Sequence, residues 1–220
     1  MTALSVLLLA DSRLPNGGHA HSGGIEMAVE AGLVSTVDDL MLFLRGRLRT
    51  AVPVVASFSA AGALLDAGWS RWDRALSARI PSAALRNASR LQGAALLRTV
   101  TGMWPMPAEL IGVGRPHQPL VLGAATRAGG GDARDAALLA THHLLGGACS
   151  AALRLLGLDP LAVAAVQASL DSTEIVEQAV AAAKVAVAAN APDSMPSVSG
   201  PMTELLAAAH AQQEVTLFAS

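Results

Sequence analysis

The chain contains very little of two residue types that carry common chemistry. Its 220 residues include one cysteine, Cys149, and one lysine, Lys184. A single cysteine excludes an internal disulfide and a cysteine-rich zinc site, and it fits a reducing compartment such as the cytoplasm. No Gly-x-x-x-x-Gly-Lys-Ser/Thr loop is present, and Lys184 lies in an alanine-rich stretch. We therefore expect no intrinsic GTP binding.

Charged and aromatic side chains are also scarce. Charged residues make up 15% of the chain and aromatic residues 3%, with no tyrosine, whereas hydrophobic residues make up 52%. Such a chain can bury a sizeable core and is too apolar to be disordered. Its formal net charge of −2 offers no general attraction to nucleic acid or to an anionic membrane. We expect neither as a partner.

Long uninterrupted apolar runs are missing as well. The run Leu4–Ala10 has no basic flank and is too short to cross a bilayer, so it predicts a first core helix rather than a signal peptide. Polar residues interrupt the apolar stretch from Leu161 to Ala189. We interpret that stretch as one or two buried helices of a soluble protein.

Helix signals recur along the chain, and no strand-like alternation is sustained. Thr36 and Asp39 form a capping-box pattern before a helix to about Ala51. Pro53 predicts the start of another helix, ending near Gly68, because proline suits a first helical turn. Further N-caps are expected at Ser82, Asp132 and Asp159.

These signals predict an all-α fold, a single domain of about ten helices. The helix-breaking glycines and prolines divide the chain into three parts. These are a body at residues 1–189, a flexible, exposed linker at 190–201, and a C-terminal helix with a docking tail at 202–220. The linker contains Pro192, Pro196, Gly200 and Pro201 with serines between them.

The densest local signal lies between Leu14 and Glu26. These thirteen residues hold four glycines, one proline, two histidines and a carboxylate. Paired glycines allow positive φ or a close approach to another surface, and Pro15 fixes its own φ. The pattern predicts a shaped loop followed by a helix from Ile25. We call residues 11–26 the signature loop.

The signature loop resembles a segment of the UreF family of urease accessory proteins. The family pattern is Asp-Ser-x-Leu-Pro-x-Gly-Gly-x-x-His-Ser-x-Gly-Leu-Glu. It is matched without a gap by Asp11, Ser12, Leu14, Pro15, Gly17, Gly18, His21, Ser22, Gly24 and Glu26. Ile25 replaces the leucine, and His19 takes the usual aromatic position.

Later stretches resemble the same family in order and distance. They are the segments 86–97, 117–123 and 150–155, and the tail residues His210, Gln213, Leu217 and Phe218. Two places depart from the family. Residues 157–164 replace a glutamine-rich stretch that belongs to the family's partner-contact regions, and Glu214 and Thr216 replace a tyrosine and an arginine.

The resemblance implies a non-enzymatic, cytoplasmic chaperone for nickel insertion into urease, with no cofactor of its own. Family members bridge a UreD/UreH-type scaffold protein and the GTPase UreG, modulate that GTPase, serve the urease apoprotein, and commonly form homodimers. We expect a dimer through apolar faces within residues 132–189. The implied partner-binding residues are Pro15, Gly17, Gly18, His19, His21, Ser22, Gly24, Glu26, Arg154, His210, Gln213, Leu217 and Phe218.

Two other classes of protein remain open. His19 and His21 with Glu26 could form the metal site of a metal-dependent hydrolase, because imidazole and carboxylate bind Ni²⁺ and Zn²⁺. No third ligand appears close to the two histidines, whereas open metal sites usually have about three protein ligands. The alternative interpretation is that His21 and Ser22 stabilise the loop and cap the next helix. The second class is a small-ligand-binding helical bundle.

Other polar side chains predict structural roles. His142 and His143 should point about 100° apart on a helix, one toward the core and one toward solvent. Cys149 should be a buried, inert thiol. Arg45, Arg47 and Arg49 are expected on a solvated helix face.

Overall fold

Eleven α-helices and one short 3₁₀-helix make up the computed structural model, which describes residues 2–17 and 22–210. No strand occurs within these ranges. The prediction of an all-α domain with about ten helices is confirmed. The helices are α1 (Thr2–Ala10), α2 (Ile25–Glu30), α3 (Val37–Leu64), α4 (Trp69–Ser77), α5 (Ala83–Thr101), α6 (Ala108–Gly112), α7 (Gln118–Ala128), α8 (Ala133–Leu156), α9 (Pro160–Ser169), α10 (Thr173–Ala188), η2 (Pro192–Ser194) and α11 (Pro201–His210).

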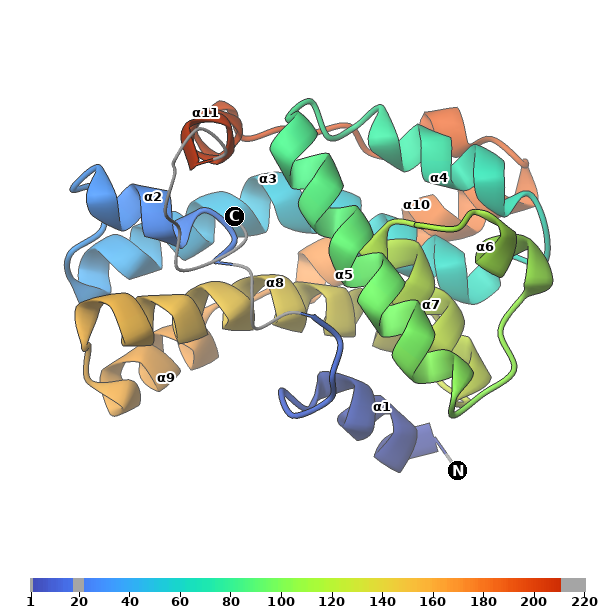
Figure 1. The fold of residues 1–220 in the computed structure, drawn as a ribbon, viewed down its shortest axis with the longest axis horizontal. Helices are drawn as coiled ribbons and strands as arrows, with labels where there is room; N and C mark the ends of the chain where they lie inside the picture. The colour runs from blue at the N-terminus through green and yellow to red at the C-terminus, as the bar shows by residue number, and fades with distance from the viewer. Residues whose placement is uncertain (1, 18–21, 211–220) are drawn as a thin grey trace.

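Helix α3 is the centre of the fold and contacts α7, α8 and α10 (Figure 1). It begins as predicted, because the Thr36 hydroxyl accepts a hydrogen bond from the Asp39 N–H while the Asp39 carboxylate accepts one from the Thr36 N–H. Such reciprocal capping satisfies donors that a helix start leaves open. The predicted caps Ser82, Asp132 and Asp159 are also confirmed at the starts of α5, α8 and α9.

Pro53 does not begin a new helix, contrary to the expectation from the sequence. It lies inside α3, which continues unbroken to Leu64. An interior proline removes one backbone hydrogen bond and costs about 3 kcal/mol. Val52, Val54 and Phe58 on either side of it are buried. Their packing against the surrounding helices outweighs the local cost of the proline.

Glycines allow α3 and α7 to cross with their backbones in contact. A Cβ built on Gly123 would lie 2.0 Å from the Ser59 carbonyl oxygen, and one built on Gly62 would lie 2.6 Å from that of Leu120. Real Cβ atoms cannot occupy these positions without moving a helix. Small residues therefore set the distance between these two core helices.

A buried polar cluster joins α4, α5 and the start of α7. The Asp73 carboxylate accepts hydrogen bonds from the His117 N–H and from Arg90, both at 2.8 Å. The His117 ring lies 2.8 Å from the Ser77 hydroxyl and 3.0 Å from that of Ser89. Burial lowers the pKa of His117 to about 4, so the ring is neutral at physiological pH. His117 is therefore a buried, neutral side chain that holds these three helices together.

Helix α1 is less buried than the predicted first core helix. Leu9 is fully buried, whereas Leu4 is 81% exposed and Leu7 and Leu8 also face solvent. The helix lies at the edge of the molecule and contacts α7 and α8 (Figure 1). The expected burial of α1 was wrong because an apolar run shows only that a helix is hydrophobic. It does not show which of its faces packs against other helices.

The chain after α10 runs back over the body. The Arg79 guanidinium donates to the backbone carbonyls of Asp193, Met195 and Pro196, and the Met195 side chain is buried. Residues 190–201 are therefore not uniformly exposed. Whether they act as a flexible linker stays a prediction, as do the domain boundaries.

Helix α8 is long and apolar enough to cross a membrane by length and composition alone. However, 56% of its most apolar window is buried inside the protein. This burial is typical of a core helix.

Candidate functional site at the cavity beside the signature loop

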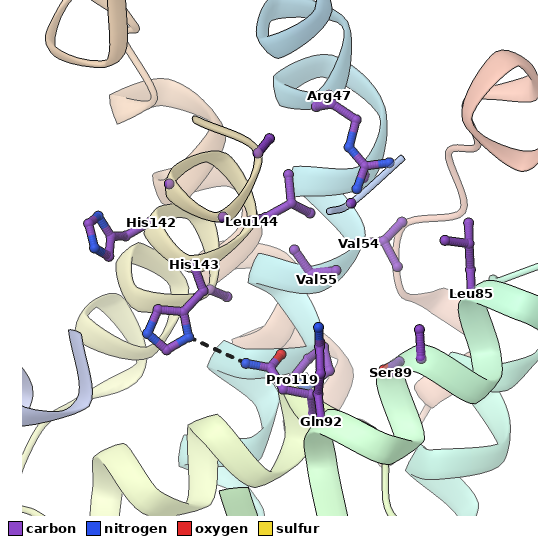
Figure 2. A pocket seen from close by; sticks show the side chains of 18 of the residues that line it. Arg47, Val54, Val55, Leu85, Ser89, Gln92, Pro119, His142, His143 and Leu144 are labelled. Atoms are coloured by element: carbon purple, nitrogen blue, oxygen red, sulfur yellow. Dashed lines mark hydrogen bonds between the residues drawn. The ribbon is translucent and has the colours of Figure 1, made fainter. Parts of the chain in front are cut away.

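A cavity of about 550 Å³ lies between α3, α5, α7 and α8. Figure 2 shows it lined by Val54 and Val55 of α3, Ser89 of α5 and Leu144 of α8. Asn16 and Gly23, from the two described ends of the signature loop, also line it. The segments 86–97, 117–123 and 150–155, which also resemble the family, each contribute to the lining. Their lining residues are Ala88, Ser89, Gln92, Gln118, Pro119, Ser150 and Arg154.

The first half of the signature loop is held against α5. The Thr99 hydroxyl donates a 2.6 Å hydrogen bond to the Pro15 carbonyl. Gly17 has φ of 77°, and a Cβ built there would lie 3.0 Å from the Cβ of Ala95. Gly17 thus combines a left-handed backbone with a close approach, the two reasons for which glycine was expected.

The second half of the loop is buried where it enters α2. Ser22 is 1% exposed and Glu26 is 2% exposed. Gly24 has φ of 90° and is the N-cap residue of α2, without a side-chain cap. The Glu26 side chain already interacts with another group of the protein. Its burial makes it unavailable for direct contact with another protein unless the loop moves.

Several candidate residues lie outside the described residues. These are Gly18, His19 and His21 in the loop and Gln213, Leu217 and Phe218 in the tail. The metal-site hypothesis at His19 and His21 is therefore untested. Within residues 2–17 and 22–210, no group of three histidine, cysteine or acidic side chains could hold a metal ion. His210 is the last residue of α11.

Arg154 lies near the end of α8, is exposed, and lines the cavity. Its Nε donates to the Ser150 carbonyl at 3.3 Å, and it has a further interaction. The stretch 157–164, which departs from the family, follows directly. Gly157 ends α8 with φ of 61°, and Asp159 caps α9. Residues 157–164 therefore form a turn and the first part of α9.

Arg47 was expected on a solvated helix face, and this was wrong. It is only 9% exposed, while Arg45 and Arg49 face solvent. Figure 2 shows its guanidinium directed from α3 toward the cavity. One pattern in the sequence indicated that Arg47 is buried, because it follows Leu44 at helical spacing and adjoins Leu48, and both leucines are buried. Glu204, which also lines the cavity, was likewise not predicted.

The two adjacent histidines have different surroundings, as expected. His142 is exposed, whereas the His143 Nε2–H donates a 2.8 Å hydrogen bond to the Leu9 carbonyl. The side-chain amide of Gln118 lies 3.5 Å from the His143 Nδ1 (Figure 2). Burial lowers the pKa of His143 to about 4. His143 therefore connects α1 to α8 as a neutral ring.

Cys149 is buried, as predicted, at 3% exposure. Burial raises the pKa of its thiol to about 11, so very little thiolate forms at neutral pH. A nucleophilic role for Cys149 has no support.

Comparison with known proteins identifies the family. The family model described as UreF matches residues 34–171. The chain is 41% identical to the urease accessory protein UreF of Mycolicibacterium vanbaalenii, with all of both chains covered. It is 39% identical to the proteins of that name from Mycobacterium marinum and Mycobacterium tuberculosis, again over the whole of both chains. The chain therefore belongs to the UreF family of urease accessory proteins.

Proposed function

We propose that this chain is a non-enzymatic chaperone of urease maturation in the cytoplasm. It would bridge a UreD/UreH-type scaffold protein and the GTPase UreG, modulate that GTPase, and so promote nickel insertion into the urease apoprotein. The observation that carries this proposal is the end-to-end similarity to urease accessory proteins at about 40% identity. GTP chemistry belongs to UreG in this scheme, because the chain has no phosphate-binding loop.

The cavity supports the proposal by bringing the resembling segments to one place. Asn16, Gly23 and Arg154 line it from the signature loop and from α8, and Gly200 lines it from the segment before α11. These segments are far apart in the chain. A partner that docks at the cavity mouth would touch all of them together, as a bridging protein requires.

Urease activation in cells tests the proposed function. Deleting the gene should abolish urease activity, and the wild-type gene should restore it. Urease activity that is unaffected by the deletion would contradict the proposal.

A pull-down of UreD/UreH and UreG from the same organism tests the bridging role. The Arg154→Ala variant should capture less of at least one partner, because Arg154 is exposed at the cavity. Arg98→Ala on α5 is a matched control, since Arg98 is also an exposed arginine but does not line the cavity. Equal capture by both variants would remove Arg154 from the contact surface.

A further inference from the structure

Arg47 carries a positive charge inside the protein and has no hydrogen-bonding partner among the described residues. Its Nε is buried and unpartnered, and within residues 2–17 and 22–210 no hydrogen bond of Arg47 to another side chain or carbonyl is present. Burying part of a charged group is costly unless other hydrogen bonds replace those it makes to water. An anion that reached the guanidinium would supply the hydrogen bond that its Nε lacks.

The charges around the cavity favour a negatively charged ligand. Arg47, Arg79 and Arg154 line it, and Glu204 is the one carboxylate among its described lining residues. Glu204 is already used elsewhere, because its Oε2 accepts a 2.7 Å hydrogen bond from the Ser82 N–H. Glu204 attracts the Arg47 guanidinium through space, but without a hydrogen bond to it.

Aliphatic side chains form the part of the cavity wall next to Arg47. Val54, Val55, Leu85 and Leu144 face the space that the Arg47 guanidinium reaches (Figure 2). The volume of about 550 Å³ is in the range of small-molecule sites. The guanidinium fork matches the two oxygens of a carboxylate, and the aliphatic part of the wall suits an apolar body attached to it.

We propose that this cavity binds a small organic carboxylate, with the carboxylate on Arg47 and an apolar body against the aliphatic walls. Ser89, Gln92 and Gln118 line the same space and offer neutral hydrogen-bonding groups. The proposal concerns the purified chain alone and does not depend on its role in urease maturation.

Octanoate is the probe, and octanamide and acetate are its controls. The amide keeps the apolar body and removes the charge, whereas acetate keeps the charge and removes most of the apolar body. Calorimetry on the full chain should give an octanoate Kd at least tenfold lower than that of either control. Octanoate binding no tighter than octanamide binding would overturn the proposal.

Arginine variants on α3 locate the site. Arg47→Gln should weaken octanoate binding at least tenfold, while Arg49→Gln, which removes an exposed arginine two residues away, should change it less than twofold. Equal losses in both variants would overturn the assignment to Arg47.

The wild-type chain offers a test that does not depend on the folding of a variant. In ¹⁵N-correlated NMR spectra, octanoate should shift the Nε–Hε signal of Arg47 and octanamide should leave it in place. An unmoved Arg47 signal at saturating octanoate would overturn the proposal.

Discussion

At the scale of single residues, Arg47 combines a cost to folding stability with the proposed binding of a carboxylate. Burial lowers its pKa to about 10, so the guanidinium remains charged at neutral pH. The protein therefore keeps a cation that, among the described residues, has no hydrogen-bond partner, beside the buried Leu44 and Leu48. Without a ligand, such a charge opposes folding.

Replacing Arg47 with methionine should stabilise the unliganded protein. Methionine fills a similar volume and removes the buried charge, so the free energy of unfolding should rise by about 1 kcal/mol or more. Urea denaturation measures the change. The matched Arg49→Met variant alters an exposed arginine and should stay within about 0.5 kcal/mol of wild type. A loss above about 1 kcal/mol in Arg47→Met would contradict the prediction.

His143 should make the fold sensitive to acid. Its folded pKa of about 4 lies below the ordinary histidine value of about 6.5. As pH falls from about 6.5 to 4, the unfolded chain takes up a proton that the folded chain does not, so stability falls. The loss from this one ring is about 2–3 kcal/mol by pH 4. Above about pH 6.5 the ring is neutral in both states and adds no pH dependence.

The His143→Gln variant isolates this effect. The glutamine amide can still donate to the Leu9 carbonyl but does not titrate. The drop in unfolding free energy between pH 7 and pH 4 should therefore shrink by about 2–3 kcal/mol. The control is His142→Gln on the same turn of α8, where the side chain is exposed. An unchanged acid profile in His143→Gln would refute the assignment.

At the scale of secondary-structure elements, the crossing of α3 and α7 depends on glycine. Gly123→Ala should lower the free energy of unfolding by about 3 kcal/mol or more, because its Cβ would meet backbone atoms of α3. The control is Gly46→Ala on α3, where a Cβ meets nothing within 4 Å. That change should stabilise the protein by about 0.5–1 kcal/mol through helix propensity. Similar effects in both variants, measured by thermal unfolding, would contradict the close crossing.

At the scale of the whole molecule, the tail after α11 is expected to dock onto a partner. Deleting residues 212–220 should leave helicity and the thermal midpoint nearly unchanged and abolish binding of the UreD/UreH-type scaffold. Deleting 201–220 is the comparison, and it should destabilise the protein, because Leu206 and Ala207 of α11 are buried. Retained scaffold binding with a large loss of stability in the shorter deletion would refute the docking role.

The chain is also expected to form a homodimer through residues 132–189. Leu161 on α9 and Val185 on α10 are 79% and 69% exposed and offer apolar surface within this region for a second copy to cover. Sedimentation should show a dimer at micromolar concentration, and Leu161→Glu should shift it toward monomer. Leu42→Glu on α3 changes a similarly exposed leucine outside this region and should leave the dimer intact. A wild-type monomer would contradict the prediction.

Local chemistry explains why much of the fold could be predicted from the sequence. The caps at Thr36, Ser82, Asp132 and Asp159 lie where the sequence places them, because each cap needs only its own side chain and the next few backbone N–H groups. The family could be recognised for a similar reason, since the signature loop is a contiguous pattern. The positive φ of Gly17 is likewise a local requirement.

Tertiary packing decided what local patterns left open. It kept α3 continuous through Pro53, left one face of α1 in solvent, and buried Arg47 while Arg49 on the same helix stayed exposed. Each outcome depends on which surfaces distant segments present to the helix. The cavity arises in the same way, because its walls come from segments separated by more than a hundred residues. The sequence alone determined the family and the four capped helix starts, because both are local patterns, and the packing of the helices determined where the cavity lies.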